Sequence, residues 1–181
     1  KKEINNSRMG NKMAKLKDYF GGDELASNVW LTKYALKDQS GKVLEETPDD
    51  MHHRIASEFA RIEAKFGGKS ALSEEQIFDL IKNFEYIVPQ GSPMMGIGNN
   101  HVNVSLSNCV VVASPDDNIS SILDSGKSLA NLFKRRCGVG LDLSELRPEG
   151  TPVNNSAGTT TGAWSFADLY SYICCMIGQN G

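Results

Sequence analysis

The stretch from Ser105 to Asp117, SLSNCVVVASPDD, constrains the fold more than any other part of the chain. In it a cysteine, Cys109, directly precedes three valines, and the run ends at Pro115-Asp116-Asp117, residues that favour a turn. Short apolar runs rich in branched residues and bounded by turn residues are typical of buried strands. We therefore predict that Cys109 begins a core strand. These residues alone leave its role open between a buried structural cysteine and a functional thiol.

A strand–helix–strand order follows from the residues around this stretch. Residues 119–133 carry apolar side chains at helical spacing and end in a basic run, which suits the negative end of a helix. Residues 137–143 form a second short apolar run entered through glycines, which we interpret as another strand. Two strands joined by a helix predict a parallel sheet in an α/β fold. A long polar loop over residues 146–162 suggests a functional segment, and an apolar helix is expected over residues 163–177.

The first half of the chain is predicted to be helical. Three capping residues predict the starts of helices. Asp23 precedes a helix expected over residues 23–36, Thr47 one that ends near Phe66, and Ser73 one that ends near Phe84. In the first, Leu25 and Val29 are expected on the apolar face; in the second, Met51, Ile55, Phe59, Ile62 and Phe66. The sequence thus predicts a disordered leader over residues 1–22, a helical region over 23–88 and an α/β region over 89–181. The α/β region opens with QGSPMMGIGNN, which we predict to be a loop whose backbone can approach a ligand.

Composition and residue spacing exclude several functional classes. The net charge of -3 argues against a nucleic-acid-binding surface, and no apolar run is long enough to span a membrane. No metal site is predicted, because the four cysteines fit no zinc spacing and the adjacent His52 and His53 point to different sides of their helix. We interpret both histidines as surface residues, and Cys174 and Cys175 as core residues of the last helix. The cysteine pattern favours a reducing compartment, so we expect a cytoplasmic protein.

Several motifs, taken in order, resemble the catalytic subunit of ribonucleotide reductases. They are QGSPMMGIGN, SLSNC, KRRCGVGLDLSELRPEG, GTTTGAWSFADLYSY and the terminal GQNG. The resemblance covers residues 23–181, and the ordered set is far more specific than any single glycine pair. It implies a helical region followed by a ten-stranded α/β barrel made of two five-stranded parallel halves. Because the chain resembles only the helical region and the opening part of that barrel, we interpret its end at GQNG as a break inside a larger fold.

The resemblance also implies a reaction. The family replaces the ribose 2′-hydroxyl with hydrogen: a thiyl radical on a finger loop takes the 3′ hydrogen, and a cysteine pair supplies reducing equivalents while forming a disulfide. Cys109 matches the first member of that pair and is the expected catalytic residue. A serine there could offer a proton but not the redox step. Since the radical-forming cysteine and the partner of Cys109 are absent, we predict that the 181-residue piece alone reduces no nucleotide.

Other positions match ligand contacts of the family. Ser92 and Asn108 match substrate-contacting positions, although Ser92 could equally be an ordinary turn residue. Gly138 matches a glycine whose backbone lies against the substrate, a role that suits a residue without a side chain. Cys137 stands where many relatives have glycine or alanine, which leaves open whether it is a neutral variation or a reactive neighbour of the site.

An allosteric specificity site is implied as well. Asp116, Asp117 and Asn118 match contacts to the base and sugar of a deoxynucleotide or ATP effector, and Arg147 matches a phosphate contact. The helix over residues 119–133 is expected to help build a homodimer interface. Gln179 and Asn180 lie in the loop that passes the effector signal to the substrate.

The expected cofactor follows from the same resemblance. GDELASNVWLTKYALKD and RRCGVGLDLSELRP look slightly more like the adenosylcobalamin-dependent class than like the class that receives its radical from a separate metal-containing subunit. The implied partners are a ribonucleotide substrate, a thioredoxin- or glutaredoxin-type reductant and the remainder of the reductase chain, with no nucleic acid and no membrane. Two alternatives stay open: a non-catalytic module for nucleotide binding and dimerisation, and one half of a split reductase.

Overall fold

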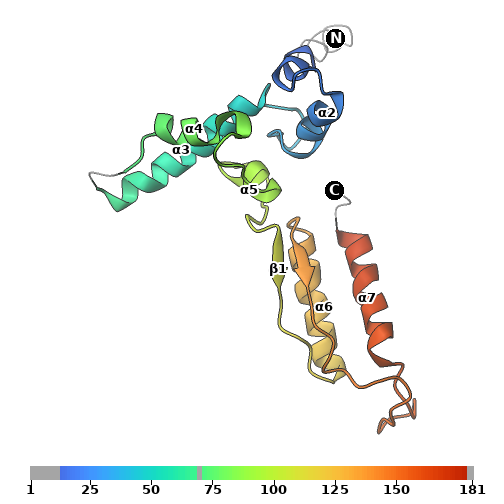
Figure 1. Cartoon of the computed structure of the whole chain (residues 1–181). Helices are drawn as coiled ribbons and strands as arrows, with labels where there is room; N and C mark the ends of the chain where they lie inside the picture. Colours follow the sequence, from blue (N-terminus) through green and yellow to red (C-terminus); the bar gives the residue numbers. More distant parts are fainter. Residues whose placement is uncertain (1–12, 69–70, 179–181) are drawn as a thin grey trace. The chain divides into compact units, whose positions relative to one another are not determined.

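The chain divides into two compact units, which we call the helical unit (Lys1–Leu106) and the strand unit (Ser107–Gly181). The computed structural model describes residues 13–68 and 71–178 of them, and Figure 1 shows the elements of each unit. The division falls later in the chain than the boundary expected after residue 88, so the segment QGSPMMGIGNN belongs to the helical unit.

The helices of the helical unit begin where their capping residues predict. They are α2 (Glu24–Lys33), α3 (Pro48–Phe66), α4 (Glu74–Ile81), the 3₁₀ turn η1 (Lys82–Phe84) and α5 (Gly91–Gly96). The side chains of Asp23 and Ser73 accept hydrogen bonds from backbone N–H groups in the first turns of α2 and α4, at 2.9 and 3.2 Å. At the start of α3 the Thr47 N–H donates to the Asp50 carboxylate at 3.0 Å. These bonds satisfy N–H groups that a helix leaves without internal partners, so the caps are confirmed.

Three expectations for this unit need correction. Residues 13–19 are helical and Leu16 is fully buried, so this part of the expected leader is folded, whereas residues 1–12 lie outside the described residues. The helix expected over 23–36 ends at Lys33. The segment expected to be a loop contains α5.

The core of the helical unit matches the expected helix faces only in part. On α2 the buried side chains are Ser27 and Trp30, while Leu25 is 74% exposed. A serine can occupy this face because its hydroxyl donates to the Asp23 carbonyl at 2.7 Å, which satisfies its polar group. On α3 the expected face is confirmed at its start, where Met51 and Ile55 are fully buried, but not at its far end, where Phe66 is 82% exposed.

His52 is a further correction, because it is fully buried rather than on the surface. Its ring packs edge-on against Phe84, with 4.7 Å between ring centroids. Burial lowers the pKa of His52, and the Asp49 carboxylate, 3.7 Å from Nδ1, opposes this shift. The prediction for His53 is confirmed: it is exposed on the outer face of α3 and stacks on Phe78.

The strand unit has the predicted parallel β-α-β arrangement. Its elements are β1 (Cys109–Val111), α6 (Ile119–Phe133), β2 (Gly138–Gly140) and α7 (Gly162–Ile177). The strands pair in parallel with Cys109 opposite Gly138. Within the described residues this sheet has two strands and does not close into a barrel.

The core of the strand unit lies between α6, α7 and one face of the sheet. Ile122, Leu129, Leu146 and Tyr170 are its buried side chains, and Val139 of β2 packs against them. A Cβ atom on Gly126 would lie 3.2 Å from the Ile173 side chain, so the glycine that weakens α6 also lets α7 approach closely.

The opposite face of the sheet is open. Side chains alternate along a strand, and Val139 of β2 points into the core. Gly138 and Gly140 therefore face the other side of the sheet, and so do Cys109 and Val111, which pair with them. Cys109 is exposed and Val111 is 82% exposed, so the expectation of a buried strand is wrong for the described residues. Cys174 and Cys175 of α7 are exposed too, which corrects their interpretation as core residues. No helix of the described residues is long and apolar enough to cross a membrane.

The long polar loop before α7 is confirmed. It contains one antiparallel bridge, between Pro152 and Thr159, and ends at Gly162. Gly162 has φ +80°, and a Cβ atom there would lie 2.7 Å from the backbone nitrogen of Glu149. Only glycine fits both this conformation and this close approach.

Candidate functional site

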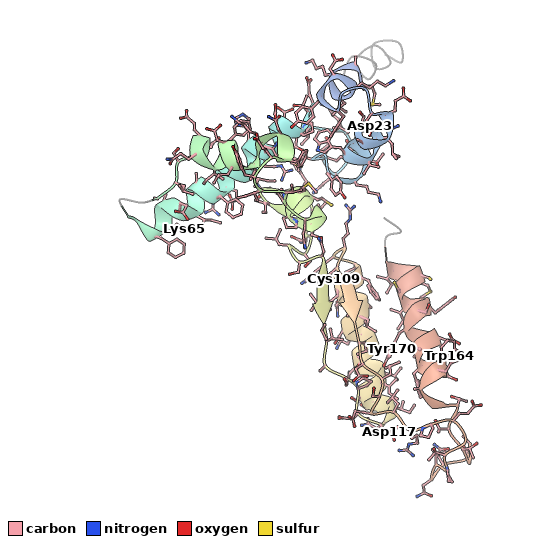
Figure 2. All side chains as sticks on the ribbon, viewed as in Figure 1. Asp23, Lys65, Cys109, Asp117, Trp164 and Tyr170 are labelled. Atoms are coloured by element: carbon pink, nitrogen blue, oxygen red, sulfur yellow. The ribbon has the colours of Figure 1, made fainter. Side chains whose placement is uncertain are left out.

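Cys109 lies at the first position of β1, where its thiol is accessible. It is a free and exposed cysteine, and it follows the loop that connects the two units. Figure 2 shows it at one end of the strand unit, with Asp117 at the opposite end. Cys109 lies at the amino end of the parallel strand pair, so the residues around its thiol decide what it can do.

Gly138 is the nearest neighbour of Cys109 on the adjacent strand. Its N–H donates to the Asn108 carbonyl at 2.7 Å, which joins the two strands directly before the paired positions. A Cβ atom on Gly138 would lie 3.3 Å from that carbonyl and 3.5 Å from the Cys109 sulfur. The absence of a side chain therefore leaves the space beside the thiol open. The structure thus brings together three of the predicted site residues: Asn108, Cys109 and Gly138.

Cys137 is close in sequence but differs from Cys109 in environment. It is 2% exposed, and its Sγ lies 3.4 Å from the carbonyl oxygen of Gly138 as a weak donor. Because consecutive side chains of an extended chain point to opposite sides, Cys137 is directed away from the face that carries Cys109. Its burial supports a packing role over a reactive one.

The predicted effector residues gather where β1 leads into α6. Asn118 caps α6 by accepting a hydrogen bond from the N–H of Ser121 at 2.9 Å. The hydroxyl of Ser121 in turn accepts from the N–H of Asp116 at 2.9 Å. The turn is therefore held by its own polar side chains, and Ser121 is a member that the sequence reasoning missed. The spacing Asn-x-x-Ser before an apolar helix was the signal for it.

Arg147 reaches this turn from the long polar loop. Its Nε donates to the Asp117 carboxylate, and its Nη2 donates to the Asp117 carbonyl at 3.3 Å. Both side chains are about one third exposed, at 37% for Arg147 and 34% for Asp117. A cation held at the surface beside a helix N-terminus is suited to bind an anion once its carboxylate partner is exchanged.

The remaining predicted residues lie elsewhere. Ser92 is 6% exposed in the first turn of α5, inside the helical unit. Gln179 and Asn180 lie outside the described residues. Among the described residues, no three His, Cys, Asp or Glu side chains are grouped so that they could hold a metal ion.

Comparisons with known proteins match both units of the chain. Residues 20–101 match the family model described as the all-alpha domain of ribonucleotide reductase, and residues 107–181 match the model described as its barrel domain.

Individual relatives are similar at modest identity. A vitamin B12-dependent ribonucleoside-diphosphate reductase of Mycobacterium tuberculosis (strain ATCC 25618 / H37Rv) is 28% identical over 156 residues, which are 86% of this chain and 22% of that protein. The subunit alpha of a ribonucleoside-diphosphate reductase of Helicobacter pylori (strain J99 / ATCC 700824) is 28% identical over 149 residues, covering 82% of this chain and 18% of that protein. The chain therefore spans about a fifth of the length of these relatives.

Proposed function

Because the chain belongs to the ribonucleotide reductase large-chain family, we propose that it supplies one half of the redox cysteine pair and the effector-binding turn of a catalytic chain. The observation that carries this proposal is the exposed thiol of Cys109 beside Gly138. The glycine leaves room for a ribose against the sulfur, and Asn108 precedes the thiol on the same strand end. The substrate is a ribonucleotide and the product a deoxyribonucleotide.

Cys109 acts on the 2′ position of the substrate in this proposal. Its thiol gives the proton that the departing hydroxyl takes up, and water leaves. The electrons come from Cys109 and a second cysteine in the remainder of the catalytic chain; the hydrogen of the second thiol ends on the 2′ carbon in place of the hydroxyl, and the two sulfurs join in a disulfide. A thioredoxin- or glutaredoxin-type dithiol then reduces this disulfide by exchange. Such a cycle needs a reducing compartment, which supports a cytoplasmic enzyme.

The turn Asp116–Asn118 with Arg147 binds the effector in this proposal. Arg147 would leave the Asp117 carboxylate to pair with phosphate, and its fixed charge and forked donors suit that partner. Asp117, once free, can accept hydrogen bonds from the sugar or base. Gln179 and Asn180 would transmit the effector's identity to the substrate, and α6 would contribute to a homodimer interface.

The proposal also names a source for the radical that starts the reaction. Among the described residues, no group of three His, Cys, Asp or Glu side chains could hold a metal ion, so the radical source lies outside the contacts seen in this chain. Adenosylcobalamin is proposed because GDELASNVWLTKYALKD and RRCGVGLDLSELRP resemble that class and because the mycobacterial relatives are named as vitamin B12-dependent. When bound, this cofactor supplies the radical that starts the reaction. The alternative is a radical from a separate metal-containing subunit.

Measuring deoxyribonucleotide formation tests this proposal directly. A polypeptide that carries this chain and the remainder of a reductase catalytic chain would receive a ribonucleotide, a dithiol and adenosylcobalamin, without a second subunit. Product that disappears when the cobalamin is left out supports the proposal and its cofactor. Product that appears only with a metal-containing subunit moves the enzyme to the other class. No product under either condition contradicts the catalytic proposal and favours a nucleotide-binding module.

Two variants and one control test the roles of these residues. Cys109→Ser should lower turnover with dithiol on the order of 10³-fold or more, because the redox step is lost. Cys175→Ser, which removes another exposed thiol, should leave turnover unchanged. Arg147→Ala should weaken effector binding about tenfold, as expected for one charged hydrogen-bonding group, without changing the KM of the substrate in the absence of effector.

A further inference from the structure

Arg54 of α3 is a buried cation at the meeting point of three segments of the helical unit. Its side chain is 10% exposed, and it pairs with the Glu45 carboxylate, which is 6% exposed. The Nε–Oε1 distance is 2.7 Å, and the other Glu45 oxygen accepts from the Leu36 N–H at 2.7 Å. A buried charge is stable only when it is paired and hydrogen-bonded, and this network satisfies both conditions.

The two Nη atoms of the Arg54 guanidinium group donate hydrogen bonds to the segment that carries Ser92. Nη2 of Arg54 donates to the Met94 carbonyl at 2.9 Å, and Nη1 donates to the Ile97 carbonyl. Met94 lies in the last turn of α5, where carbonyl groups have no partner within the helix. A cation at this end also suits the negative end of the helix dipole. Arg54 is thus a side-chain cap for the C-terminal end of α5.

Gly98 shows that the chain is shaped around this arginine. It has φ +70°, and a Cβ atom there would lie 2.8 Å from Cγ of Arg54. Glycine at this position lets the backbone after α5 close over the arginine stem. One of the glycines that make QGSPMMGIGNN look like a flexible loop therefore lies against the side chain of Arg54.

We propose that Arg54 is a positioning residue for substrate binding, because it holds α5 and thereby Ser92 in place. This rests on the proposed function, in which Ser92 contacts the ribonucleotide. α5 is only six residues long and begins with glycine, so its own hydrogen bonds cannot fix it. Arg54 fixes it by joining the carbonyl oxygens of Met94 in α5 and of Ile97, its C-cap, to Glu45. Lysine can replace it only in part, because an ammonium lacks the forked donors.

The test measures KM and kcat for the ribonucleotide in a catalytic chain of full length. Arg54→Ala should raise KM about tenfold, within the range that misplacing a positioning group can cost, with a smaller change in kcat. Arg54→Lys should give an intermediate KM. Arg61→Ala is the matched control, since Arg61 lies on the same helix, is 54% exposed and pairs with Glu58 of that helix. It should leave both constants unchanged.

A double-mutant comparison shows whether Arg54 acts through Ser92. If it does, Arg54→Ala adds little to the KM of a Ser92→Ala enzyme, because the contact is already lost. An equal rise in KM in both backgrounds overturns the proposal, and so does a Ser92→Ala enzyme with unchanged KM. A wild-type chain that forms no product contradicts the proposed function itself, which is a different result from an active enzyme whose KM ignores Arg54.

A second variant covers the case in which Arg54→Ala does not fold. Gly98→Ala keeps the charge pair but forces Arg54 to move, so it should raise KM in the same direction. Gly67→Ala is its control, because Gly67 also has positive φ, +51°, but has open space around its Cβ position. A Gly98→Ala enzyme whose KM matches that of the Gly67→Ala enzyme overturns the proposal.

Discussion

The helical unit and the strand unit place their polar side chains differently. In the helical unit Glu45 and Arg54 are paired in the interior, and His52 is fully buried. In the strand unit Cys109 is exposed, and the Asp117–Arg147 pair is about one third exposed. Buried polar groups specify how segments pack, whereas accessible ones can meet a ligand. Under the proposed function, the helical unit would position α5 through its interior, while the strand unit would offer Cys109 and Arg147 to ligands at its surface.

The largest expected effect on stability lies in the core of the helical unit. Ile55→Ala should lower the free energy of unfolding by about 2–5 kcal/mol, because it removes a fully buried side chain and leaves a cavity. Phe66→Ala on the same helix should change it by less than about 0.5 kcal/mol, since Phe66 is 82% exposed. Urea unfolding followed by Trp30 fluorescence, in a Trp164→Phe background, reports on this unit alone. Equal losses in the two variants would contradict the burial pattern of α3.

The long loop of the strand unit should show a smaller effect that depends on one glycine. Gly162→Ala combines positive φ with a steric overlap against Glu149, so we expect a loss of about 1–3 kcal/mol. Gly158→Ala has a similar φ, +77°, but open space at the Cβ position, so its loss should be only about 1 kcal/mol. Thermal or urea unfolding followed by far-UV circular dichroism compares the two. A larger loss of unfolding free energy for Gly158→Ala than for Gly162→Ala would show that Gly162 does not pack closely against Glu149.

The α6–α7 contact contains one buried side-chain hydrogen bond. The Tyr170 hydroxyl donates to the Ile122 carbonyl at 2.8 Å, and burial raises the pKa of Tyr170. Tyr170→Phe should lower the free energy of unfolding by about 1 kcal/mol. Tyr172→Phe, two residues along the same helix and 65% exposed, should have no measurable effect. The same unfolding experiment distinguishes the two variants. A Tyr170→Phe variant with an unchanged free energy of unfolding would mean that the hydroxyl bonds to solvent rather than to Ile122.

Sequence reasoning recovered the elements because their signals are local. Asp23 and Ser73 each predict the start of a helix, because the side-chain oxygen of each caps a backbone N–H only three residues later. The parallel β-α-β arrangement follows equally from neighbouring residues, and Asn118 was identified next to the helix that it caps. The family motifs predicted that Asn108, Cys109 and Gly138 share a site, and the strand pairing brings them together.

Burial was harder to predict because it depends on what else packs against an element. The valines after Cys109 look like a core strand, yet Val111 is exposed because the described residues cover only the other face of the sheet. α5 was missed because the bonds that support it come from Arg54, which is distant in sequence. His52 looks like a surface residue, since a polar ring on a helix is usually solvated, but Phe84 closes over it.

That buried histidine leads to the smallest expected effect, which appears only in acid. Burial lowers the pKa of His52 below its ordinary value of 6.5, so as the pH falls below about 6.5 the unfolded chain takes up a proton that the folded chain resists. The contribution to stability is therefore complete above that pH and is lost as the pH falls toward the folded-state pKa. Urea midpoints measured across this range should fall for the wild type and for His53→Gln, whose ring is exposed. In His52→Leu this part of the fall should be missing. An unchanged pH dependence in His52→Leu would mean that groups other than His52 carry the acid sensitivity of the helical unit.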